Sequence, residues 1–219
     1  MTISVENFVK TIYKQSKLLK ADTKLSTVAG LLNITNAAAT DMARKLATKK
    51  LVNYTKYKPL TLTPSGKKLA LKVIRKHRLW ESFLHRTLNL SLHEIHKEAE
   101  YLEHLTSDFL AEKIEQYLGC PTIDPHGDPI PTYNGMVASD KSQLLLSEAE
   151  AGKSYKISRL YSSEKDFFDF CNANHITLGT RIRVERQYDS KKMTEIIINQ
   201  NRLLLNELFT HVIFVKQII

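Results

Sequence analysis

The stretch from His96 to His104 restricts the possible folds of this chain more than any other. It reads HKEAEYLEH and separates His96, Glu100, Glu103 and His104 by four, three and one residues. At 3.6 residues per turn these four side chains project from one face of a helix. The pattern therefore predicts a helix with imidazole and carboxylate groups gathered along one side.

A second pair at helical spacing, His77 and Glu81, lies upstream in KHRLWE. Imidazole and carboxylate groups, with little thiolate, form the ligand set of a divalent transition metal such as Mn(II) or Fe(II). A salt-bridged surface is the alternative, but three histidines and three glutamates at helical spacing favour a metal site over it.

The basic residues are concentrated in the N-terminal part of the chain. Residues 1–90 contain 18 Lys and Arg and 4 Asp and Glu, whereas residues 91–219 contain 14 and 19. A basic module followed by a mildly acidic remainder is typical of nucleic-acid binding with an attached regulatory body. The alternative is a solubilising surface.

Length and composition exclude several other classes of protein. A chain of 219 residues allows one large domain or two to three small ones, and 42% hydrophobic residues suffice for packed cores. No apolar run reaches membrane-spanning length, and the N-terminus lacks the pattern of a secretory signal. Cys120 and Cys171 lie far apart and are expected to be free thiols, Cys120 as a small buried one. We therefore expect a cytoplasmic protein without a membrane partner.

The basic part has the element order of a winged helix-turn-helix. Hydrophobic periodicity predicts helices over 4–18, 26–32 and 36–49, with Thr35 or Asn36 as the N-cap of the third. Residues 51–54 and 60–63 alternate as two strands, and a long helix over 64–87 follows. The link between the strands carries lysines, as a wing against a DNA backbone would.

The expected DNA contacts lie on the outer face of the third helix and on this wing. Small side chains at the start of that helix allow close approach to the major groove, and Asn and Thr can reach bases or phosphates. The expected DNA-binding residues are Thr35, Asn36, Ala37, Ala38, Thr40, Asp41, Arg44, Lys56 and Lys58.

The C-terminal third reads as a small β domain. Residues 132–145 look like a linker, and strands are predicted over 154–160, 181–186, 195–199 and 212–215, with one helix over 164–172. There is no Gly-rich phosphate loop and no persuasive Ser/His/Asp order, so the sequence predicts no catalysis.

Three segments in order, KHRLWE, HKEAEYLEHLTSD and CPTIDPHGDPIP, resemble the diphtheria toxin repressor family of metal-dependent bacterial regulators. The resemblance covers about residues 4–131 and is weak beyond them. It implies a mainly α fold with small β parts. The implied parts are a winged-helix DNA-binding domain (1–72), a helical metal-binding and dimerisation domain (73–131), a linker (132–145) and an SH3-like, FeoA-like barrel (146–219).

The resemblance also implies two metal sites. The principal site joins a first-helix position, here Asn7, to Glu100, Glu103 and His104. Asn7 departs from the usual Asp or Met and is alternatively a polar residue near a helix start. Lys10 stands where some manganese regulators have a further carboxylate, which argues against a closely spaced pair of metals. The second site joins residues from several segments: His77, Glu81, His96, His126, Asp124 and Glu164, of which Asp124 is alternatively a turn residue.

The function implied is that of a homodimeric repressor, activated by Mn(II) or alternatively Fe(II), that binds a palindromic DNA operator and controls metal homeostasis genes. No organic cofactor and no enzyme activity are expected. One rival is a metallohydrolase built on the His/Glu cluster, which would need an open metal position, a general base and a substrate pocket. The other rival is a winged-helix regulator that senses an organic ligand.

Overall fold

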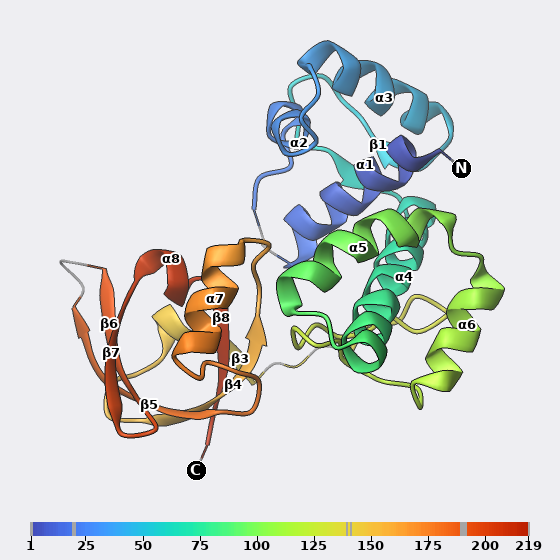
Figure 1. Ribbon diagram of the computed structural model, residues 1–219. Helices are drawn as coiled ribbons and strands as arrows, with labels where there is room; N and C mark the ends of the chain where they lie inside the picture. Colours follow the sequence, from blue (N-terminus) through green and yellow to red (C-terminus); the bar gives the residue numbers. More distant parts are fainter. Residues whose placement is uncertain (1, 19–20, 139, 141, 189–191, 219) are drawn as a thin grey trace. The chain divides into compact units, whose positions relative to one another are not determined.

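The computed structural model describes residues 2–18, 21–138, 140, 142–188 and 192–218 (Figure 1). Its contacts divide the chain into two compact units. Unit 1 comprises Met1–Trp80, Ala99–Glu115 and Ile130–Val137. Unit 2 comprises Glu81–Glu98, Gln116–Pro129 and Ala138–Ile219. Among the described residues, no helix is both long enough and apolar enough to cross a membrane.

Unit 1 begins with the predicted winged helix-turn-helix. Its elements are α1 (Ile3–Tyr13), continued by a π-helical turn over Lys14–Leu18, then α2 (Leu25–Leu31), α3 (Asn36–Thr48), β1 (Val52–Asn53) and β2 (Thr61–Leu62). Thr35 is the N-cap of α3, because its hydroxyl accepts a hydrogen bond of 3.1 Å from the Ala38 N–H. The strands pair antiparallel, with Val52 opposite Leu62, and are shorter than predicted.

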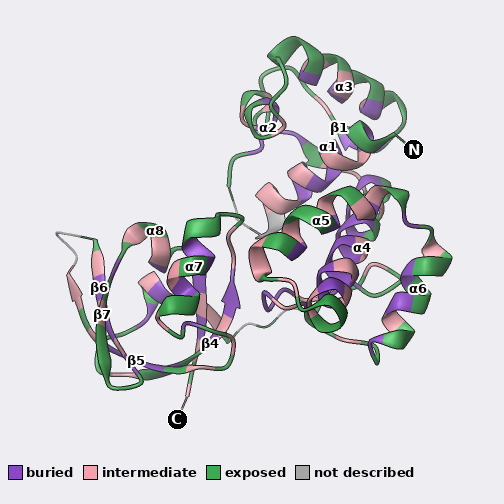
Figure 2. Cartoon of the chain, in the orientation of Figure 1, coloured by how far each residue is buried: buried purple, intermediate pink, exposed green. Residues whose placement is uncertain are grey.

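Hydrophobic side chains from α1, α2 and α3 form the core of unit 1. Phe8, Ile12, Val28 and Leu46 are fully buried there, and Met42 packs against them partly buried. The buried residues lie on the inner side of each helix and leave one face of α3 exposed (Figure 2). The amphipathic pattern thus orients α3 as the sequence predicted.

Three further helices follow: α4 (Pro64–Leu88), α5 (Leu92–Leu105) and α6 (Asp108–Tyr117). The predicted His/Glu residues at helical spacing lie on α4 and α5. The Thr63 hydroxyl caps α4 by accepting a hydrogen bond of 3.1 Å from the Gly66 N–H. Gly66 also lies directly against the Leu51 carbonyl, just before β1, where a Cβ would come within 1.9 Å of that oxygen. The start of α4 is therefore packed tightly against the chain that leads into β1.

The C-terminal part of unit 2 is the predicted small β domain. Its antiparallel sheet has the order β3-β8-β4-β5-β6-β7. The strands are β3 (Gln143–Leu145), β4 (Ser154–Leu160), β5 (Arg181–Tyr188), β6 (Met193–Ile198), β7 (Asn201–Asn206) and β8 (Ile213–Gln217). The helices α7 (Lys165–Ala173) and α8 (Glu207–Thr210) and a 3-10 turn over Leu146–Glu148 contribute to its core.

Three sequence predictions need correction here. Residues 143–145, predicted as linker, form edge strand β3, and their pairing with β8 could not be read from a three-residue pattern. Strand β7 and helix α8 were not predicted, because β6 and β7 are joined by a tight turn at Asn199 and Gln200, both with positive φ. Cys120 is exposed rather than buried, because the chain turns away from α6 there with a φ of 56°. Both cysteines are free, as predicted.

Replacement of Gly66 by Ala should destabilise unit 1. The new methyl group would overlap the Leu51 carbonyl, and an overpacked contact of this kind costs about 1–3 kcal/mol. Gly30→Ala in α2 is the matched control, because a Cβ there meets nothing within 4 Å and Ala favours a helix by about 0.5–1 kcal/mol. In urea unfolding, the midpoint concentration should fall below that of the wild type for Gly66→Ala and not for Gly30→Ala. Equal midpoints for the two variants would contradict the close approach of Gly66 to Leu51.

Candidate metal centre and nucleic-acid interface

A buried lysine lies among the carboxylates of the predicted principal metal site. Lys10 Nζ is 2.7 Å from Oε1 of Glu100 and 2.7 Å from both carboxylate oxygens of Glu103. The side chains of Lys10 and Glu103 are 5% and 0% exposed. His77 completes this group, with Nδ1 2.7 Å from Oε2 of Glu103. We call Lys10, His77, Glu100 and Glu103 the lysine-filled cluster.

The lysine-filled cluster holds the Glu100 carboxylate in the ionised state. Burial alone would raise the pKa of Glu100, but the charges of Lys10, His77 and Lys14 outweigh it and lower that pKa to about 2. The ligand atoms of His77, Glu100 and Glu103 lie within 4.8 Å of one another, which suits a metal ion by distance and donor type. However, the ammonium group already satisfies the carboxylate oxygens that such an ion would use.

The other two residues of the predicted principal site lie near this cluster. His104 Nδ1 is 2.7 Å from Oε2 of Glu6 on α1, and its Nε2 is 3.1 Å from Oε1 of Glu103. Asn7 is half-buried on α1, one turn before Lys10, and its side chain makes no hydrogen bond with any described residue. The first helix therefore contacts α5 through Glu6 and Lys10, two residues that were not predicted as members of the site.

A second group of donors, the histidine cluster, lies in unit 2. It consists of Glu81 on α4, His96 on α5 and His126 in the loop that follows α6. Oε1 of Glu81 is 3.0 Å from Nδ1 of His96 and 3.4 Å from Nε2 of His126. Two ligands of one ion, each about 2.1 Å from it, are separated by roughly 3 Å. Both distances are those of polar contacts to one carboxylate oxygen, and the donor atoms of the three residues do not all lie within 4.8 Å of one another. A shared divalent ion would therefore have to draw them together.

His126 is the best indicator of a ligand in the histidine cluster. It is 5% exposed, and neither ring nitrogen makes a well-directed hydrogen bond within the described parts of the chain. Burial alone would lower the pKa of His126, but the neighbouring carboxylates of Glu81, Asp124 and Asp128 raise it. Buried polar atoms in proteins are normally satisfied, so these nitrogens, of which Nε2 only approaches Glu81 at 3.4 Å, are candidate donors for a metal.

The loop that carries His126 is fixed by local contacts. Oδ1 of Asp124 accepts hydrogen bonds of 2.9 Å from the N–H groups of His126 and Asp128. Gly127, with a φ of 88°, lies so close to strand β4 that a Cβ would be 2.2 Å from the Ser158 carbonyl. Oδ1 of Asp124 thus acts in the turn, and the role of Asp124 as a metal ligand stays a prediction.

Arg159 on β4 anchors this loop to the sheet. Its Nη2 is 2.7 Å from Oδ1 of Asp128, and both side chains are less than 10% exposed. The guanidinium group also lies over the rings of Tyr161 and Phe214, at 4.5 and 4.8 Å from their centroids. Neither Arg159 nor Asp128 was identified from the sequence, because a single Arg in a strand carries no recognisable spacing.

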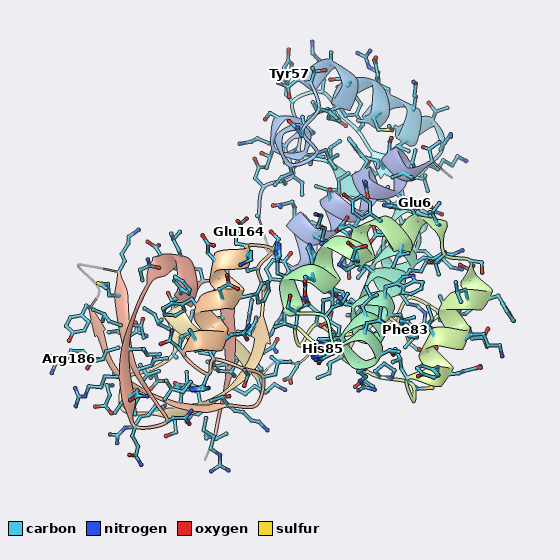
Figure 3. The ribbon with its side chains drawn as sticks, in the orientation of Figure 1. Glu6, Tyr57, Phe83, His85, Glu164 and Arg186 are labelled. Atoms are coloured by element: carbon cyan, nitrogen blue, oxygen red, sulfur yellow. The ribbon has the colours of Figure 1, made fainter. Side chains whose placement is uncertain are left out.

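Glu164 occupies the N-cap position of α7 and is exposed (Figure 3). The neighbouring Ser163 carbonyl lies 3.2 Å from Nδ1 of His93, one turn before His96 on α5. Phe168 on α7 packs against the His126 ring, at a centroid distance of 5.3 Å. These contacts bring the start of α7 to the side of the histidine cluster, without placing the Glu164 carboxylate in it.

The predicted DNA-binding residues form a basic surface in unit 1. Thr40 and Arg44 of α3 line one groove together with Lys56 and Lys58 of the wing, and Tyr57 at the wing tip is 90% exposed (Figure 3). Asn36, Ala37, Ala38 and Asp41 are exposed on the same helix. The Thr35 and Thr40 hydroxyls are engaged locally, as the cap of α3 and as donor to the Asn36 carbonyl. Lys24 and Tyr57 also line the groove and were not predicted.

Three consecutive segments of the chain match models of known protein families. Residues 1–60 match the N-terminal DNA-binding domain of the iron-dependent repressors. Residues 63–132 match the metal-binding and dimerisation domain of the same family. Residues 144–217 match the FeoA domain. A winged helix, a helical metal-binding region and an SH3-like sheet in this order define a metal-dependent transcriptional repressor.

Individual relatives support the same assignment. An HTH-type transcriptional regulator of Methanocaldococcus jannaschii is 36% identical to this chain. The match covers 54% of this chain and 94% of that protein. The HTH-type transcriptional regulator MntR of Geobacillus kaustophilus is 32% identical, and that match covers 47% of this chain and 72% of that protein. The match to the diphtheria toxin repressor of Corynebacterium efficiens is 40% identical and spans 37% of this chain but only 35% of that protein.

A solved structure of a manganese-dependent transcriptional repressor in complex with manganese superposes with a TM-score of 0.91 at 29% identity, covering 98% of this chain and all of that one. The chain therefore belongs to the iron-dependent repressor family of metal-dependent transcriptional regulators.

Replacement of Arg159 by Ala should destabilise unit 2. Asp128 would remain as a buried carboxylate without its partner cation, and breaking a buried ion pair in this way costs about 3–5 kcal/mol. Arg186→Ala is the matched control, since Arg186 also lies beside an aromatic ring, that of Tyr188, but is exposed. Thermal unfolding followed by circular dichroism should show a loss only for Arg159→Ala, and a comparable loss in the control would refute the anchor.

Proposed function

We propose that this protein is a Mn(II)-responsive repressor that binds an operator in the promoters of metal homeostasis genes. The observation that carries the proposal is the histidine cluster, with its buried and otherwise unused His126, in a chain of the iron-dependent repressor family. Carboxylate and imidazole donors fit Mn(II), and Fe(II) is the alternative. Neither cysteine belongs to a group of ligands: Cys120 is exposed, and burial raises the pKa of the Cys171 thiol to about 12.

Glu81, His96 and His126 would hold the metal in this proposal, and the exposed Glu164 would have to turn inward to join them. The ion would supply a divalent charge that draws these donors together and neutralises the Glu81 carboxylate. Each of the three donors belongs to a different segment, α4, α5 or the loop after α6. Such a charge favours the conformation in which the three segments are joined, and this preference is the free energy available for regulation.

Helix α4 provides the physical connection between the proposed metal site and the proposed DNA surface. It begins directly after β2 of the wing, where Gly66 packs on Leu51, and carries Glu81 four turns later. Metal binding at Glu81 would therefore act on the wing through this continuous helix. Lys56 and Lys58 of the wing and Arg44 of α3 would contact phosphates, while exposed residues at the start of α3 face the bases.

A homodimer on a palindromic operator is part of the proposal. An apolar surface on α5 and α6 supports it, because Tyr101, Leu105, Phe109 and Leu110 are between 42% and 82% exposed. Large apolar side chains that gather on an exposed surface are typical of an interface. A two-fold dimer would present two α3 helices to half-sites about one turn of DNA apart.

Loss of one histidine-cluster ligand should weaken Mn(II) binding and metal-dependent operator binding together. His126→Ala removes a buried donor, and we expect affinity for Mn(II) to fall at least about 100-fold. His211→Ala, an exposed histidine of the same unit, is the control. Isothermal titration and operator binding at controlled Mn(II) measure the two effects. If operator binding by the wild type does not depend on Mn(II), the alternative function, a winged-helix regulator that senses an organic ligand, is favoured.

Neutralisation of basic groove residues should weaken DNA binding through lost phosphate contacts. Arg44→Ala, Lys56→Ala and Lys58→Ala should each flatten the slope of log affinity against log salt by about 0.9. Lys165→Ala removes an exposed lysine that pairs with Asp169 in unit 2 and should leave the slope unchanged. Fluorescence anisotropy over a salt series gives the slopes, and equal slopes for all four variants would remove this surface from the interface.

A further inference from the structure

We propose that Lys10 is an internal cation that takes the place of a metal ion in the lysine-filled cluster. In this protein the first helix is joined to α5 by an ammonium group, whether or not metal is present. The divalent ion of the proposed function then acts only at the histidine cluster. The inference rests on the proposed function for that second site, but the state of the first site stands on the contacts of Lys10 alone.

The contacts of Lys10 are those of a bound cation rather than of a surface ion pair. Its ammonium group donates to three carboxylate oxygens of Glu100 and Glu103, each at 2.7 Å. An ammonium has three protons, so these contacts use all of its donors. Lys10 and Glu103 are almost wholly buried, and a surface pair would not be.

Charge compensation explains why the lysine remains in the cluster. The carboxylates of Glu103, which is buried, and Glu100, which is 37% exposed, repel each other unless a cation lies between them. Lys10 supplies that charge from within the chain, on a helix that is itself packed into the core by Phe8 and Ile12. A metal ion entering this cluster would have to expel a buried ammonium and leave it without its partners.

The neighbouring contacts reinforce the same linkage without a metal. Glu6, one turn before Lys10 on α1, accepts a hydrogen bond of 2.7 Å from His104 on α5. The carboxylate and the cation thus alternate between the two helices: Glu6 and Lys10 on α1 pair with His104 and the two glutamates of α5. This reciprocal arrangement pairs the carboxylates of the principal site with groups of the chain itself, while Nε2 of His104, 3.1 Å from Oε1 of Glu103, makes no well-directed hydrogen bond among the described residues.

Removal of the ammonium should create a metal site where the wild type has none. Lys10→Met keeps the length of the side chain but removes its charge, so that Glu100 and Glu103 stand beside His77 without the ammonium group. The full chain is freed of metal with a chelator and then titrated with Mn(II). This variant should then bind about one Mn(II) ion per chain more than the wild type does. Lys14→Met, one turn further along and also lowering the pKa of Glu100 by its charge, is the matched control and should bind no extra ion.

Two further variants assign each ion to a cluster. The extra ion of Lys10→Met should be lost in Lys10→Met/Glu103→Gln and kept in Lys10→Met/His126→Ala. Wild-type Mn(II) binding should survive Glu103→Gln and be lost in His126→Ala. Mn(II) binding that is lost from the wild type on Glu103→Gln would overturn the proposal, because it would show that metal displaces Lys10. An extra ion in Lys10→Met beside a wild type that binds none would support this proposal and overturn the proposed function.

Amide hydrogen exchange provides a readout that does not depend on stoichiometry. In the chelator, the amides of α1 should be protected in the wild type and in Lys14→Met, and Mn(II) should not increase that protection. In Lys10→Met they should exchange at least about tenfold faster without metal and recover with Mn(II). If Lys10→Met folds only when Mn(II) is present, the same conclusion holds. Wild-type α1 protection that requires Mn(II) would overturn it.

Discussion

The buried ion pair between Lys10 and Glu103 is the interaction on which the arrangement of unit 1 depends. A carboxylate with 0% side-chain exposure is stable only with a cation beside it, and breaking such a pair costs about 3–5 kcal/mol. That penalty is comparable to much of the stability of a small domain. The position of α1 against α5 is therefore fixed by charge as well as by the hydrophobic core of the winged helix.

The two clusters place the same residue types in different electrostatic states. In the lysine-filled cluster both carboxylate oxygens of Glu103 accept from Lys10, and Oε2 also lies 2.7 Å from Nδ1 of His77. In the histidine cluster Glu81 lies between two imidazoles, one of which, His126, has unused nitrogens. Donor identity makes both look like metal sites, and the location of the compensating cation distinguishes them.

The sequence predicted the elements well where periodicity and capping act locally. The helix over 36–49 with a cap at Thr35, the long helix over 64–87 and the strand over 154–160 all lie within one or two residues of the observed bounds. Edge strand β3 and the anchor Arg159 were missed, because their roles depend on β8 and Asp128, which are distant in the sequence. The candidate site shows the same limit: helical spacing indicated which residues share a face, but not which partner from α1 would reach them.

Asn7 and Lys10 both differ from the residues that other family members have at these positions, and the charge of the cluster explains the two differences together. Family resemblance would put acidic groups on this face of α1, where a metal ion could balance them. Here Asn7 is neutral and Lys10 is positive, so the first helix brings a cation to the glutamates of α5 instead of adding further negative charge. With Asn7 alone, the cluster would be a weaker metal site; with Lys10 as well, it carries its own counter-ion. A family resemblance identifies which positions form the site. The charges of the residues at those positions decide whether the site needs a metal ion.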